Sequence, residues 1–63
     1  MIKMNKGTET LIINPERVNN EGTIRITIEK RDAKNAVISR NFMLGQQSDL
    51  FNLRCKAWNE GWK

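Results

Sequence analysis

The pattern of hydrophobic and polar residues is clearest over residues 22–30, where Ile24, Ile26 and Ile28 alternate with polar residues. A period of two is typical of a strand with one buried face. Asn, Gly and Asp residues on either side tolerate turn geometry, so they bound the segment. The pattern therefore predicts a β-strand over residues 22–30 with the three isoleucines in the core.

A second strand is expected over residues 36–44, after a turn that ends at Asn35. If Asn35 adopts a left-handed backbone, the turn closes an antiparallel hairpin with a loop of three to five residues. Ile38 and Phe42 are expected in the core, but Arg40 has the same parity. Either Arg40 lies at the edge of the sheet or a bulge switches the face of the strand.

A shorter strand is predicted over residues 8–13, which are rich in Thr and Ile. Pro15 ends it, because proline cannot donate a hydrogen bond to the ladder and restricts the residue before it. Alternatively, Asn14 caps one helical turn that extends to Val18. Residues 1–7 are either a frayed end or the start of this strand.

After position 45 the period changes to about 3.6, which predicts a helix over residues 48–59. Ser48 is a suitable N-cap, and Asp49 lies at the positive end of the helix dipole. Gly61 is expected to end the helix with a left-handed backbone. Residues 62–63 then either fold back or extend into solvent.

These elements predict one small α+β domain over residues 1–63, in which a three-stranded antiparallel sheet packs against one C-terminal helix (β-β-β-α). This order resembles the three-stranded-sheet DNA-binding domains of plant AP2 factors and of phage integrase arm-binding regions. The resemblance is architectural and matches no residue motif of those families, so it assigns no functional residue. It implies contact between the sheet and duplex DNA.

The apolar residues of the predicted helix and its extension cover an arc of roughly 200°, which is wider than the stripe of an ordinary surface helix. They are Leu50, Phe51, Leu53, Cys55, Ala57, Trp58 and Trp62. A three-stranded sheet covers only part of this arc. Either one aromatic residue of the helix is therefore partly exposed, or the uncovered part of the arc contacts a second copy or another protein. The candidate protein-interaction residues are Phe51, Arg54, Trp58 and Trp62.

Two further residues of the helix, Arg54 and Cys55, carry expectations of their own. Arg54 lies near the middle of the apolar arc, so it should extend to solvent or pair with a carboxylate such as Glu29. Cys55 has no histidine to activate it and is expected to be a small buried apolar residue.

Composition argues against catalysis. The chain has no His and one Cys, which excludes an internal disulfide, a Cys/His zinc site and His-based acid–base chemistry. Its carboxylates are scattered along the sequence, and Gly45 lacks the residues that follow a phosphate-binding glycine. We therefore expect a non-enzymatic chain with no catalytic residues, no metal, no cofactor and no small-molecule substrate.

No apolar run is long enough to span a membrane or to serve as a signal peptide. The predicted helix also lacks the basic polar face of an interfacial helix, so no membrane partner is expected. A single Cys without a signal peptide favours a reducing, cytoplasmic location.

Basic residues are more informative, because 11 Lys and Arg against 7 Asp and Glu give a net charge of +4. Many of them gather on the predicted hairpin, and Arg and Asn side chains reach base edges in a major groove while Lys, Arg and Thr reach phosphates. Single strands are less favoured, because the aromatic residues are assigned to the core and the helix. The predicted function is binding of duplex DNA by the hairpin, through Arg25, Thr27, Lys30, Arg31, Lys34, Arg40 and Asn41. The alternative is a protein-interaction module, an inhibitor or adaptor, that uses the apolar helix face.

Overall fold

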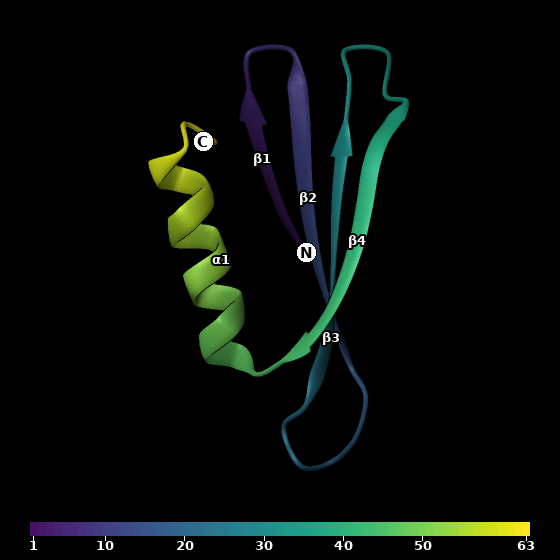
Figure 1. Cartoon of the computed structure of the whole chain (residues 1–63), viewed down its shortest axis with the longest axis vertical. Coiled ribbons are helices and arrows are strands. Elements are labelled where there is room, and N and C mark those ends of the chain that lie inside the picture. The colour runs from purple at the N-terminus through teal and green to yellow at the C-terminus, as the bar shows by residue number, and fades with distance from the viewer.

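The computed structural model describes all 63 residues as a four-stranded antiparallel meander followed by one helix (Figure 1). The elements are β1 (Ile2–Lys6), β2 (Glu9–Arg17), β3 (Ile24–Arg31), β4 (Val37–Gly45) and α1 (Gln47–Asn59). The strands lie in the order β1-β2-β3-β4, with α1 beside β1 and away from most of β4 (Figure 1). The α+β class and the C-terminal helix are confirmed, but the sheet has four strands and not three.

The additional strand, β1, forms from the residues at the start of the chain. Lys6 pairs with Glu9 of β2 across a two-residue turn that begins at Gly7, whose φ is 61°. Such tight hairpin turns require a positive φ, which glycine adopts at no steric cost. The other edge of β1 is held by the end of the chain, because the backbones of Asn5 and Lys63 exchange two hydrogen bonds of 2.7 and 2.9 Å.

β2 continues past Pro15, so neither the predicted end at residue 13 nor the helical turn from Asn14 is present. The pairing with β1 starts at Ile13, which faces Ile2, and beyond it β2 has only β3 as a neighbour. Proline is tolerated there because β1 does not extend that far, so no hydrogen bond to β1 is lost when the N–H is absent.

The β3–β4 hairpin is confirmed, and Asn35 has the left-handed backbone that was expected, with φ 66°. The face of β4 is settled by a bulge: Ser39 faces Lys30, but Val37 faces Arg31, so Ile38 is an extra residue. The bulge switches the face of the strand, and β4 is also an edge strand, so both alternatives for Arg40 are present.

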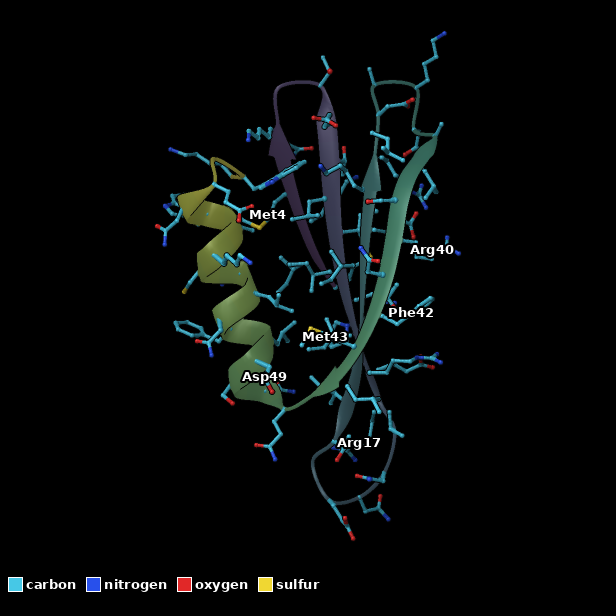
Figure 2. All side chains as sticks on the ribbon, in the orientation of Figure 1. Met4, Arg17, Arg40, Phe42, Met43 and Asp49 are labelled. Atoms are coloured by element: carbon cyan, nitrogen blue, oxygen red, sulfur yellow. The ribbon has the colours of Figure 1, made fainter.

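The register of β4 places its residues opposite to what their hydrophobicity suggests. Phe42 faces Thr27 and Arg40 faces Glu29, so both point away from α1, whereas Met43 points to the side of the helix (Figure 2). The expectation that Ile38 and Phe42 enter the core was wrong, and no residue of β4 is buried.

The core lies between α1 and the first three strands. Seven side chains are buried in it, namely Met4, Leu11, Ile13, Ile24, Ile26, Ala57 and Trp62. Leu50 and Leu53 of α1 pack against their margin. Complete burial of an isoleucine stabilises a fold by about 1.5–3 kcal/mol, so Ile13 and Ile26, at the centre, contribute most among the strands.

Both ends of α1 have specific caps. The N-cap is Gln46 and not Ser48, and its backbone N–H donates to the Asp49 carboxylate at 2.8 Å. Gly61, with φ 100°, ends the helix as expected and turns the chain back toward β1. The Trp62 side chain therefore folds back into the core, and the backbone N–H of Trp62 donates to the Ala57 carbonyl at 3.0 Å.

Candidate nucleic-acid interface

The face of the sheet opposite α1, which we call the open face, is not covered by any other element (Figure 1). The strand register assigns its residues, since paired residues share a face and neighbours along a strand alternate. From β1 to β4 they are Lys3, Asn5, Thr10, Ile12, Asn14, Glu16, Arg25, Thr27, Glu29, Arg31, Val37, Arg40, Phe42 and Leu44. The face thus carries four cations and two carboxylates, with hydroxyl and amide groups between them.

Phe42 is the one aromatic residue of the open face, and 61% of its surface is accessible. The Arg25 guanidinium lies 5.9 Å from the centroid of its ring, within range of a cation–π contact. Arg40, two positions away on β4, points in the same direction (Figure 2). The ring is therefore flanked by arginine along and across the strands.

Glu29 organises the other half of the open face. Its carboxylate accepts a hydrogen bond of 2.6 Å from Nε of Arg31 and one of 3.2 Å from an Nη of Arg40. Although partial desolvation opposes it, the Arg31 hydrogen bond, with the positive charges of Arg31 and Arg40, lowers the pKa of Glu29 below its ordinary value. Two arginines share one carboxylate, so the trio retains one positive charge.

A shallow hollow of about 380 Å³ lies at the end of the sheet nearest α1's N-terminus, beside Arg25 and Leu44. The other lining residues are Glu16, Arg17 and Val18. Arg25 forms an ion pair with Glu16, so the hollow has both a cation and an acceptor at its wall.

Four of the seven predicted nucleic-acid residues share the open face: Arg25, Thr27, Arg31 and Arg40. The remaining three lie elsewhere. Lys30 points to the helix side, where its Nζ lies 5.7 Å from the centroid of the Trp62 ring. Asn41 also faces the helix side, and Lys34 lies in the turn beyond the sheet. The basic residues near the hairpin turn, Lys30, Arg31 and Lys34, therefore point in three different directions.

The predicted protein-interaction residues are likewise separated. Phe51 and Trp58 are 65% and 54% exposed, and together with Arg54 and Cys55 they line a hollow of about 290 Å³ on the outer side of α1. Trp62 is only 5% exposed and belongs to the core.

One expectation for the helix was wrong, because Cys55 is exposed and not buried. Of the two alternatives for Arg54, exposure to solvent is the one present. Pairing with Glu29 is absent, since that carboxylate lies on the opposite face of the sheet and binds Arg31 and Arg40. The reason in both cases is that the sheet covers only the stripe of Leu50, Leu53 and Ala57, so the apolar arc divides into a buried and an exposed part.

Sequence reasoning missed Phe42 as a surface residue. The signal was its parity with Arg40, because a strand that places an arginine on one face places the residue two positions later on the same face. Lys3 and Asn5 were missed because β1 was not recognised as a strand.

No protein-family model, curated protein or solved structure matches this chain. No cluster of three or more potential ligands could hold a metal ion. The single helix is too short and too polar to cross a bilayer.

Proposed function

We propose that this chain is a non-enzymatic nucleic-acid-binding module that holds a single strand on the open face of its sheet. The observation that carries the proposal is Phe42, an exposed aromatic ring on the open face with Arg25 and Arg40 beside it. Proteins that bind single strands combine aromatic rings, on which bases stack, with cations that follow the backbone.

The form of the sheet favours a single strand over a duplex. Neighbouring strands lie about 4.8 Å apart, so four of them span about 14 Å between their outer backbones, whereas the major groove is about 12 Å wide. A two-stranded ribbon would enter that groove, but β3 is paired on both sides and cannot separate as such a ribbon. The hairpin-in-groove hypothesis therefore gives way to binding on the open face.

In the proposed complex, a base stacks on the Phe42 ring, and Arg25 and Arg40 contact the phosphates on either side of it. Arg31 supplies a third cation, held in place by Glu29. Thr27, which lies directly opposite Phe42, offers a hydroxyl group to the stacked base or its sugar. Stacking of this kind tolerates any sequence, because every base has a π-face.

A matched pair of phenylalanines tests the proposal. Binding of a fluorescently labelled 12-nucleotide single strand is measured by anisotropy for the unmodified protein, for Phe42→Ala and for Phe51→Ala. Loss of one stacked base costs about 1–3 kcal/mol, so Phe42→Ala should raise the Kd about 5- to 150-fold. Phe51 is equally exposed but lies on α1, so Phe51→Ala should bind as the unmodified protein does.

Two results would contradict the proposal. One is equal affinity of Phe42→Ala and the unmodified protein for the single strand. The other is a clear preference for a duplex of the same length, which would restore the hairpin as the contact surface.

A second candidate function is protein interaction through the outer side of α1. The specific observation is the hollow between Phe51 and Trp58, two large aromatic side chains that are more than half exposed. Exposed aromatics around a concave surface are typical of interaction hot spots. In this case Trp58→Ala should abolish association with the partner and leave nucleic-acid binding unchanged.

A further inference from the structure

β4 is a free edge strand with unusual side chains for such a position. All of its residues except Gly45 are exposed, and five of them are large and apolar: Val37, Ile38, Phe42, Met43 and Leu44. Proteins normally protect an edge with charges, proline, a β-bulge or a very short strand. β4 has a bulge at Ile38, but residues 39–45 after it contain no proline and a single charge, Arg40, so their unpaired backbone groups are open to another strand.

The opposite edge of the sheet is protected. β1 has five residues, two of them lysines, and its backbone is bound by Lys63 through Asn5. Beyond β1, the exposed part of β2 contains Pro15. The molecule therefore has one open edge, β4. If a second copy adds to this edge, it must do so through its own β4.

We propose that two copies of this chain pair through β4, antiparallel and about a two-fold axis at Asn41, to form one continuous eight-stranded sheet. Such an isologous contact uses the same surface on both copies and closes on itself. The pairing is independent of the proposed nucleic-acid binding, although it would place two open faces side by side.

Charge selects this register among those that keep side chains on matching faces. With the axis at Asn41, Arg40 of one copy lies opposite Phe42 of the other, and Ile38 lies opposite Leu44. Cation–aromatic and apolar pairs across strands are both favourable. An axis at Arg40 would place two like charges opposite each other, which is destabilising. An axis at Phe42 would leave Arg40 opposite Leu44, without a partner.

The first test is the oligomeric state, measured by sedimentation equilibrium without nucleic acid. The unmodified protein should be a dimer at high micromolar concentration. Leu44→Lys should raise the dissociation constant at least about tenfold, because a lysine would lie against Ile38. The double variant Ile38→Glu with Leu44→Lys should restore the dimer, since each substituted side chain then faces an opposite charge. Phe51→Lys, an equally exposed position on α1, is the control and should leave the dimer intact.

A disulfide reports the register directly. In a Cys55→Ser background, Asn41→Cys should crosslink two copies when oxidised glutathione is added, because the axis passes through this position. Met43→Cys should not, since its two copies would be separated by about four residues, or about 13 Å. Circular dichroism of each variant verifies that the monomer is folded.

Three outcomes overturn the proposal. They are a monomer at all concentrations, a dimer that Leu44→Lys does not weaken, and a dimer that Trp58→Ala dissociates, which would place the contact on α1. None of them affects the comparison of Phe42→Ala with Phe51→Ala on a single strand, so failure of the dimer and failure of nucleic-acid binding can be told apart.

Discussion

Glu29 is the only charged side chain that the fold buries, at 8% exposure, and it serves the open face by holding two arginines. Without this carboxylate, Arg31 and Arg40 would repel each other and lose their fixed positions. Glu29 also faces Arg40 directly across β3 and β4, so the ion pair supports the strand that has no buried residue.

The lowered pKa of Glu29 predicts a pH dependence of stability. Between the lowered pKa and the ordinary value of 4.5, the unfolded chain binds a proton that the folded chain does not. The contribution is therefore complete above pH 4.5 and is lost as the pH falls through the pKa of the folded state. Urea unfolding at pH 7 and pH 3 should show a larger loss for the unmodified protein than for Glu29→Gln.

The matched control is Glu16→Gln, which removes the exposed ion pair with Arg25. Exposed pairs contribute little, so this variant should follow the unmodified protein at both pH values. An acid response that is identical in Glu29→Gln and the unmodified protein would show that Glu29 does not cause it.

Gly45 carries a second prediction at this scale. A Cβ at this position would lie 2.7 Å from Oδ2 of Asp49, the atom that accepts the N–H of Gln46. Gly45→Ala should therefore displace the cap and cost about 1 kcal/mol of the free energy of unfolding. In an Asp49→Ala background the same substitution should cost clearly less, because the clash and the cap are already absent. Additive losses in this double-mutant cycle would exclude the explanation.

At the scale of elements, what could be predicted is what depends on neighbouring residues. The β3–β4 hairpin was predicted because alternation and a turn ending at Asn35 are local signals, and the end of α1 because Gly61 is a local signal too. β1 was missed because it has only five residues, of which only Met4 is buried, and because its outer edge is bound by residue 63, at the other end of the chain.

The candidate site was predicted only in part for a related reason. The face of β4 depends on a bulge at Ile38, and the hydrophobic pattern of the strand is compatible with either face. Arg25 and Thr27 were placed correctly because β3 alternates without interruption, whereas Asn41 was assigned to the wrong face by one residue of register. The same one-residue error in register assigned Phe42 to the core, so the exposed aromatic ring was not recognised.

The two tryptophans test how the chain end is held. Trp62 follows the helix stop and fills the core, with the Nζ atoms of Lys6 and Lys30 at 6.0 and 5.7 Å from its ring centroid. Trp62→Ala should cost about 3–5 kcal/mol, enough to unfold a domain of this size. Trp58→Ala, four residues earlier and exposed, removes only a contact with Lys63, whose Nζ lies 5.1 Å from the ring centroid, and should cost at most about 1 kcal/mol. Thermal unfolding followed by circular dichroism distinguishes them, and equal effects would contradict the core assignment.

At the scale of the whole molecule, the number of arginines that contact phosphates predicts how binding responds to salt. Three arginines on the open face that each contact one phosphate of a single strand give a slope of about −2 in a plot of log K against log salt. Affinity for the 12-nucleotide strand should therefore fall about 20-fold between 50 and 200 mM salt. Arg40→Gln should reduce the slope by about 0.7, since it removes one contact.

The control for this measurement is Lys56→Gln, which removes one charge from α1, on the other side of the sheet from the open face. It should shift the affinity slightly and keep the slope. A slope that falls equally in both variants would indicate attraction by overall charge and not by a defined surface.

The backbone bonds between Asn5 and Lys63 have a consequence for how many neighbours a molecule can acquire. In the proposed dimer, β4 is the open edge while residues 62–63 stay in place, so each sheet has valence one and association stops at two copies. If these residues detach, the backbone of β1 becomes free as well, and a molecule with two available edges has valence two. Growth then has no end point, because each added copy brings a new edge with it. The position of residues 62–63 thus determines whether the proposed association ends at a dimer or continues as an open-ended polymer.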